Sequence, residues 1–247
     1  MNKVNQKNIL ITGSSGGLGF YLSELFNKEG HNVFLNGSTK KRLDIAMNKL
    51  GVSGMLADVT IEKNCKRLIK NCEKAIGNLD IVICNVGSGK SVETGKEDVK
   101  EWKRVFDINF FSTVNTVNAL KDYSNSKKLS VICISSICGN EYVPGAPATY
   151  SVAKSALNNY VNIYSKYLEP KGINLNGIVC GNILFPGSAW ESKIKSKKDK
   201  SNILKNVPTR TFASPNDIYK MIKVLSNKDS FISGSSIVVD GGQTRSI

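Results

Sequence analysis

Two groups of residues have the types and the spacing for one kind of chemistry. Tyr150 and Lys154 stand four positions apart, so on a helix they would share one face and place a phenol beside an ammonium group. Near the start of the chain, glycines at 13, 17 and 19 follow a short apolar run, a pattern typical of a turn that holds a dinucleotide pyrophosphate. Together these residues favour a nicotinamide-dependent redox enzyme.

The glycine-rich turn lies between a strand expected over residues 8–11 and a helix expected over 18–29. Glycine lets the backbone turn tightly and approach a ligand closely, and the following helix offers free N–H groups and the positive end of its dipole to phosphate. A purely structural turn is the alternative. The candidate cofactor contacts here are Gly13, Ser15, Gly17, Leu18 and Gly19.

The residues that follow the second expected strand, 33–35, indicate which nucleotide binds. Residues 36–42 contain no carboxylate that could accept hydrogen bonds from a ribose 2′-hydroxyl. Two hydroxyls at 38–39 and three cations at 40–42 suit a 2′-phosphate instead. We therefore expect NADP(H) to be preferred, with Ser38 as a contact. NAD(H) is the alternative, in which case residues 40–42 only open a solvated helix.

Apolar strand-like runs alternate with helical periodicity along the whole chain. Expected strands cover 8–11, 33–35, 55–57, 81–84, 130–134, 175–179 and 236–239, and expected helices cover 18–29, 40–50, 61–76, 105–121, 150–168 and 216–226. This order indicates a parallel sheet covered on both faces. The predicted fold is α/β, a doubly wound Rossmann-type parallel sheet of about seven strands with helices on both faces. No linker divides the chain, so we expect one domain over 1–247.

These residues resemble the short, single-domain branch of the short-chain dehydrogenase/reductase family, and the resemblance covers nearly the whole chain. Within the family the chain is similar to 3-oxoacyl-(acyl-carrier-protein) reductases. Residues 84–87 look like a variant of the family's Asn-Asn-Ala-Gly segment, and residues 239–242 match its C-terminal strand ending. The remaining matches are single positions: Asp58, Val59, Asn109 and Ser136.

The resemblance implies a role for each of four catalytic residues. Tyr150 would exchange a proton with the substrate oxygen, and Ser136 would hydrogen-bond that oxygen. Lys154 would hold the nicotinamide ribose and, together with the positive nicotinamide ring, lower the pKa of Tyr150. Asn109 would sustain a proton relay through water to Lys154. Further cofactor contacts implied by the resemblance are Asp58, Val59, Asn85, Gly87 and Ile183, together with Tyr150 and Lys154 themselves.

The chain departs from the family pattern around the substrate. Cys180 and Gly181 stand where a Pro-Gly is usual, and the Ser136-to-Tyr150 spacing is slightly long, which suggests an extra loop residue near 140–146. We expect residues 184–212, long and without clear periodicity, to form a mobile substrate lid in which Trp190 contacts the substrate.

The net charge of +14 is carried mainly by lysine, with one dense run at 193–200. It has two explanations: the solvated surface of a lysine-rich chain, or an anionic partner such as a phosphorylated or nucleotide-linked substrate. Cations interleaved with aromatic residues are absent, so we expect no nucleic-acid partner. Neither a membrane-spanning apolar run nor a signal peptide is visible, so we expect no membrane partner and a cytoplasmic location.

The six cysteines form no CxxC pair, and Cys84 and Cys133 fall in apolar strand-like runs. We expect buried reduced thiols and no metal site. The single histidine, His31, follows the first helix and is expected to be exposed rather than catalytic.

The sequence thus predicts an NADP(H)-dependent oxidoreductase that reduces a ketone or oxidises a secondary alcohol, with a 3-oxoacyl thioester as the nearest substrate analogy. One alternative is an oxidoreductase acting on a sugar or nucleotide-sugar in surface-polysaccharide biosynthesis. Another is a non-catalytic NADP(H)-binding regulator on the same fold. The resemblance also implies a homo-oligomer, either a tetramer or a dimer.

Overall fold

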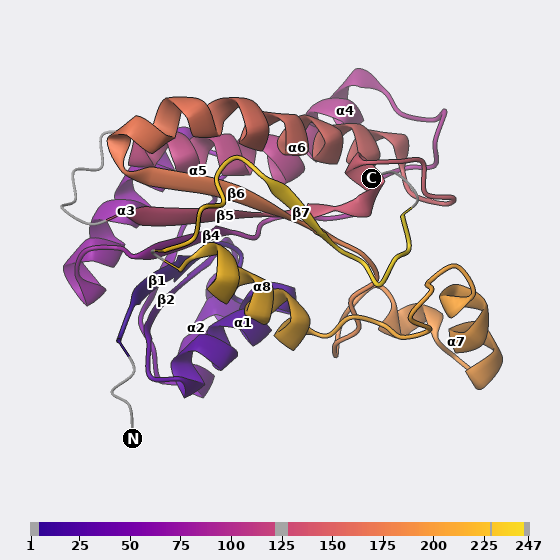
Figure 1. Ribbon diagram of the computed structural model, residues 1–247, viewed down its shortest axis with the longest axis horizontal. Coiled ribbons are helices and arrows are strands. Elements are labelled where there is room, and N and C mark those ends of the chain that lie inside the picture. Colours follow the sequence, from indigo (N-terminus) through magenta and orange to yellow (C-terminus); the bar gives the residue numbers. More distant parts are fainter. Residues whose placement is uncertain (1–4, 122–127, 228, 245–247) are drawn as a thin grey trace.

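A seven-stranded parallel sheet forms the centre of the protein in the computed structural model, which describes residues 5–121, 128–227 and 229–244 (Figure 1). The strand order is β3-β2-β1-β4-β5-β6-β7. The strands are β1 (Asn8–Ile11), β2 (Asn32–Gly37), β3 (Gly54–Leu56), β4 (Ile81–Cys84), β5 (Leu129–Ser136), β6 (Ile173–Cys180) and β7 (Ser236–Val239). The helices are α1 (Gly17–Lys28), α2 (Lys40–Leu50), α3 (Glu62–Ile76), α4 (Val99–Phe106), α5 (Ser112–Leu120), α6 (Ala148–Leu168), α7 (Lys197–Leu204) and α8 (Pro215–Leu225). The predicted doubly wound fold is confirmed.

Helices cover both faces of the sheet, and each face has its own apolar core (Figure 1). α3, α5 and α6 pack on one face, while α1, α2 and α8 pack on the other. Every residue of β5 and β6 is buried, as a central strand between two helical layers requires. Burial of each leucine or isoleucine side chain stabilises the fold by roughly 1.5–3 kcal/mol relative to its exposure. These two strands therefore hold the residues that follow them in fixed positions.

The strand order reverses direction at β1, which pairs with β2 on one side and with β4 on the other. In open parallel sheets, ligands bind at such a point, in the crevice beyond the carboxyl ends of the strands. The glycine-rich turn follows β1 and Asn85 follows β4, so both lie at this crevice.

The helix expected over 105–121 is longer and interrupted. It begins at Val99 because the Asp98 carboxylate accepts a hydrogen bond from the Glu101 amide at 2.8 Å. A π-helical turn, Asp107–Phe111, then separates α4 from α5. An aspartate followed three positions later by a glutamate is a capping pattern, and it was the available signal for this start.

Residues 181–214 leave the sheet after β6 and return at α8. The two ends of this segment meet where Ile183 pairs with Ala213, and α7 lies on a lobe that projects beyond the sheet (Figure 1). The expectation of an irregular segment is wrong for 197–204, because Ser196 and Asp199 cap a helix there: the Ser196 hydroxyl accepts from the Asp199 amide at 3.1 Å. Within the described part of the chain, no helix is long and apolar enough to cross a membrane.

His31 is buried, which corrects the expectation that it is exposed. Its Nδ1 accepts a hydrogen bond from the Lys7 amide at 3.2 Å, and its ring contacts that of Phe26, so it fixes the turn before β2. Burial lowers the pKa of His31 and favours the neutral ring that this bond requires. The predicted burial of Cys84 and Cys133 is confirmed, and all six cysteines are free thiols. Cys138 is half-buried, which corrects the expectation that all six are buried.

Candidate active site

The glycine-rich turn has the geometry of an anion site. Gly13 and Gly17 have φ values of +63° and +57°, a region that favours glycine. A Cβ at Gly19 would lie 2.5 Å from Asn85 Nδ2 and 2.9 Å from the Gly13 carbonyl oxygen, so only glycine fits. No side chain caps α1, and its first turn holds no acidic residue. Its free N–H groups therefore fit a phosphate group.

Thr12 and Asn36 hold this turn in place, and sequence reasoning did not single them out. Thr12 Oγ1 accepts from the Asn85 amide at 3.0 Å, joining the ends of β1 and β4. The buried Asn36 side chain accepts from the Gly13 amide at 3.2 Å and donates to the Ala57 carbonyl at 2.9 Å, joining β1, β2 and β3. A buried asparagine at a strand end was a weak signal, since its partners lie far along the chain.

Arg42 reaches from α2 to the glycine-rich turn. A Cβ at Gly16 would lie 2.7 Å from Arg42 Nη2, so the guanidinium group lies directly on this glycine. Lys40, by contrast, pairs with Asp44 at 2.7 Å, one helical turn away. Of the three cations at 40–42, Arg42 is the one that the structure brings against the turn. The sequence indicated the group of three but not this member.

Tyr150, Ser136 and Lys154 meet at the carboxyl ends of β5 and β6. Tyr150 and Lys154 lie on one face of α6, with Lys154 Nζ 6.0 Å from the centroid of the tyrosine ring. Ser136, the last residue of β5, lies close enough to Tyr150 for its hydroxyl to lower the pKa of the phenol. The spacing of residues 150 and 154 thus gives the predicted pairing of a phenol with a cation.

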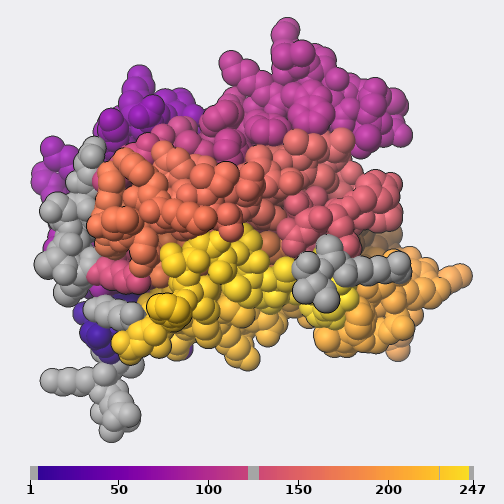
Figure 2. All heavy atoms as spheres, turned by 45° about the horizontal axis from the view of Figure 1, so that its top comes forward, coloured from indigo at the N-terminus to yellow at the C-terminus, as the bar shows by residue number. Residues whose placement is uncertain are grey.

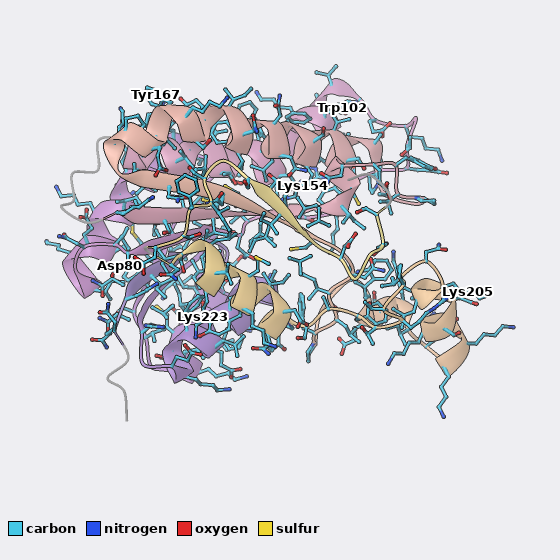
Figure 3. All side chains as sticks on the ribbon, in the orientation of Figure 1. Asp80, Trp102, Lys154, Tyr167, Lys205 and Lys223 are labelled. Carbon is cyan, nitrogen blue, oxygen red and sulfur yellow. The ribbon has the colours of Figure 1, made fainter. Side chains whose placement is uncertain are left out.

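Asn109 and Lys154 converge on Gly87. A Cβ at position 87 would lie 3.2 Å from Asn109 Oδ1 and 3.3 Å from Lys154 Nζ. Asn109, buried in the π-helical turn, accepts from the Ser88 amide at 2.8 Å and donates to the Ser88 carbonyl at 3.0 Å. Lys154 donates to the Ile134 carbonyl at 2.8 Å and lies between α6 and the sheet (Figure 3).

Burial dominates the ionisation of this pair. It lowers the pKa of Lys154 to about 8 and raises the pKa of Tyr150 well above its usual range, although the Ser136 hydroxyl opposes the second shift. The lysine alone therefore does not lower the tyrosine pKa. The lowering of the Tyr150 pKa expected from the sequence is therefore not produced by the residues of this chain alone, because burial outweighs the effect of Ser136.

The other predicted cofactor positions lie along the same edge of the sheet. Ser38 is exposed directly after β2, and Asp58 is exposed after β3, where its carboxylate accepts from the Thr60 amide and hydroxyl at 3.0 and 2.7 Å. Val59 is buried, and Ile183 forms the bridge to Ala213. Leu18 packs partly into the core beneath the turn, while Ser15 lies against Gly37.

Comparisons with known proteins identify the family of this chain. Residues 13–244 match a family model described as enoyl-(acyl carrier protein) reductase. The 3-oxoacyl-[acyl-carrier-protein] reductase FabG of Rickettsia typhi is 30% identical over 240 residues, covering 96% of each chain. The chain belongs to the short-chain dehydrogenase/reductase family. It is an NAD(P)-dependent oxidoreductase of that family.

Other members of the short-chain dehydrogenase/reductase family are similar over comparable lengths. Glucose 1-dehydrogenase 2 of Bacillus subtilis is 28% identical over 251 residues, covering 96% of this chain and 95% of the relative. An NADPH-bound short-chain oxidoreductase of Pseudomonas aeruginosa has the same fold, with a TM-score of 0.87 at 22% identity and coverage of 97% of this chain and 98% of that chain.

The lysine run of this chain lies on the projecting lobe, which is formed by the segment 181–214 (Figure 1). Six of the thirteen residues from 193 to 205 are lysine, and all six are exposed. No carboxylate of the described residues forms an ion pair with any of them. Lys205 lies on the outer part of the lobe (Figure 3). Trp190, half-buried at its base, contacts Phe212 with ring centroids 6.0 Å apart.

Proposed function

We propose that the protein is an NADP(H)-dependent oxidoreductase that reduces a ketone, or oxidises the matching secondary alcohol, by hydride transfer. The observation that carries this proposal is the meeting of Tyr150, Ser136 and Lys154 at the edge of the sheet that also bears the glycine-rich turn. Bound NADPH would supply the hydride. No group of three metal-ligating side chains is found in the described residues, and the proposal uses no metal.

Each of the four residues has a distinct task in ketone reduction. Tyr150, which burial keeps protonated, gives its proton to the substrate oxygen as negative charge develops there. Ser136 donates a hydrogen bond to the same oxygen. Lys154 remains a cation below about pH 8 and stabilises the tyrosinate that forms. Asn109, close to Lys154 across Gly87, would sustain a proton relay through water to Lys154.

Arg42 supports NADP(H) over NAD(H). Its guanidinium group lies on Gly16 of the turn that would receive the pyrophosphate, and Ser38 follows directly after β2. A 2′-phosphate on the adenosine ribose would accept charge-assisted hydrogen bonds there, and no carboxylate within residues 36–42 would repel it. Ser38 would add a hydroxyl donor.

For the substrate, we propose first a 3-oxoacyl thioester, as the names of the FabG relatives suggest. The 184–212 segment would act as the substrate lid, with Trp190 contacting the substrate. The Ile183–Ala213 bridge would fix the base of this lid beside the nicotinamide. We place the reaction in the cytoplasm.

A ketone or alcohol on a sugar, including a nucleotide-linked one, is the second candidate. Two observations favour it: the unpaired lysines of the lobe would attract a phosphorylated substrate, and a glucose dehydrogenase is among the similar relatives. A non-catalytic NADP(H)-binding regulator is the third candidate, against which the pairing of Tyr150 with Lys154 counts.

Following NADPH oxidation by absorbance distinguishes these candidates. Turnover of an acetoacetyl thioester but not of a keto-sugar supports the first candidate, and the reverse result supports the second. Cofactor binding without turnover of either ketone with NADPH, and without turnover of the matching secondary alcohols with NADP⁺, supports the regulator.

We also propose a homo-oligomer, a dimer or tetramer, formed through the outer face of α6. Figure 2 shows α6 running across one face of the molecule between α4 and the C-terminal segment. Four apolar side chains are exposed on α6 and the adjoining π-helical turn: Phe111, Val152, Ile163 and Tyr167. An Ile163→Lys variant should sediment as a smaller species than the unaltered protein. An unchanged sedimentation coefficient in an oligomeric protein would contradict this choice of face.

A further inference from the structure

Asn158 shares a helix face with the two central residues of the site. It follows Lys154 by four positions and Tyr150 by eight, so the three side chains leave α6 in the same direction. Asn158 is half-buried, whereas the next residue, Asn159, is exposed. The mechanism proposed above assigns no task to Asn158.

Both ends of the Asn158 amide are used, and both reach one short segment. Its oxygen accepts a hydrogen bond from the Ser135 hydroxyl, and its nitrogen donates to Asn140 Oδ1 at 2.7 Å. Ser135 and Asn140 delimit residues 135–140, which we call the serine segment because it contains Ser136. A single side chain of α6 is therefore bonded to the first and the last residue of this segment.

The middle of the serine segment is packed directly against the same helix. A Cβ at Gly139 would lie 2.6 Å from the carbonyl carbon of Lys154, so the backbones of the segment and of α6 are in close contact. Within the segment, the Cys138 amide donates to Ser136 Oγ at 3.2 Å. The segment is thus held to α6 by one backbone contact and by the two Asn158 hydrogen bonds on either side of it.

We propose that Asn158 is a positioning residue that sets Ser136 relative to Tyr150. Ser136 comes from the sheet and Tyr150 from the helix, and both must reach one substrate oxygen, so their separation depends on how β5 and α6 are joined. Asn158 joins them at this point. The inference rests on the proposed function, because it assigns Ser136 and Tyr150 to the same reacting atom. A misplacement of about 1 Å costs on the order of a hundredfold in rate.

The test compares Asn158→Leu, which keeps the size but removes both hydrogen bonds, with Asn159→Leu as the matched control. We expect kcat for ketone reduction to fall roughly tenfold to a hundredfold in Asn158→Leu, with an unchanged NADPH dissociation constant. Asn159→Leu should match the unaltered enzyme. Asn158→Asp should recover most of the activity, because a carboxylate still accepts from Ser135 and Asn140 can turn its amide to donate.

A double-mutant cycle separates positioning from general structural support. If Asn158 acts through Ser136, then Asn158→Leu should add little to the loss already caused by Ser136→Ala. Equal losses in the two backgrounds would overturn the inference, and so would an unchanged kcat in Asn158→Leu.

Amide hydrogen exchange gives a readout that does not require activity. Amides 136–140 should exchange faster in Asn158→Leu than in the unaltered protein, and Asn159→Leu should leave them unchanged. If Asn158→Leu does not fold, Ser135→Ala and Asn140→Ala each remove one of the two hydrogen bonds and take its place. Unchanged exchange would refute the link itself. Absence of turnover in the unaltered protein would refute only the proposed function.

Discussion

Replacing Lys154 by methionine should abolish ketone reduction and yet stabilise the fold. Lys154 is 3% exposed, and burial lowers its pKa from 10.5 to about 8. At about 1.4 kcal/mol per pKa unit, holding this side chain charged in the folded protein at neutral pH costs roughly 3 kcal/mol. Methionine has a similar length and no charge, so the variant avoids that cost.

The stability gained in Lys154→Met should be smaller than the electrostatic cost of holding Lys154 charged. Methionine cannot donate to the Ile134 carbonyl, to which Lys154 donates at 2.8 Å, and the loss of this hydrogen bond offsets about 1 kcal/mol. We therefore expect the free energy of unfolding at neutral pH to rise by about 2 kcal/mol in Lys154→Met. Lys166→Met, at an exposed lysine of the same helix, serves as the control and should change stability by less than about 0.5 kcal/mol.

The stability difference between Lys154→Met and the unaltered protein should depend on pH. Between about pH 8 and 10.5 the folded protein has lost the Lys154 proton while the unfolded chain still binds it, so the stability contributed by this site rises with pH. The advantage of Lys154→Met should consequently shrink by about 2 kcal/mol between about pH 7.5 and 9.5. Urea unfolding followed by tryptophan fluorescence at both pH values, at one protein concentration, measures it. A variant that is less stable than the unaltered protein, by the same amount at both pH values, would refute the reasoning.

Three further predictions concern the cofactor and the reaction. Arg42→Ala should raise the KM for NADPH roughly tenfold to a hundredfold and leave the KM for NADH unchanged, because only the 2′-phosphate loses a charge-assisted hydrogen bond. Initial rates with both cofactors test this, and an equal rise in both KM values would contradict it. The kcat for ketone reduction should fall as pH rises above about 8, because Lys154 then loses its charge; a pH–rate profile flat up to pH 10 would contradict the assignment. Gly19→Ala should reduce the free energy of unfolding by about 1–3 kcal/mol and abolish NADPH binding, since its Cβ would meet Asn85 Nδ2 and the Gly13 carbonyl oxygen. Urea unfolding measures the loss of stability, and quenching of tryptophan fluorescence by NADPH measures binding.

The alternation of apolar runs was sufficient to predict the fold. All seven strands and the order of the principal helices follow from it, because a strand buried on both faces is continuously apolar and a helix on a sheet is periodic. The errors fell where a polar cap decides the outcome, at Asp98 before α4 and at Ser196 before α7. Such caps act through one or two hydrogen bonds, which apolar periodicity does not reveal.

The site likewise contains residues that could be predicted from the sequence and residues that could not. Tyr150 and Lys154 could be placed together from their spacing alone, because a helix brings residues four apart onto one face. Arg42 and Asn158 could not be placed, because their partners are distant in sequence: Gly16 lies in the turn after β1, and Ser135 and Asn140 flank the end of β5. Ionisation was also beyond sequence reasoning, since the raised pKa of Tyr150 comes from burial that only the packed structure defines.

The most direct test of the proposed function is NADPH oxidation with an acetoacetyl thioester, comparing the unaltered protein with Tyr150→Phe. Phenylalanine keeps the ring and removes only the hydroxyl group that the mechanism requires as the proton donor. We predict turnover by the unaltered protein, loss of that turnover in Tyr150→Phe, and equal NADPH affinity in both. Turnover that persists undiminished in Tyr150→Phe would contradict the assignment of Tyr150 as the proton donor.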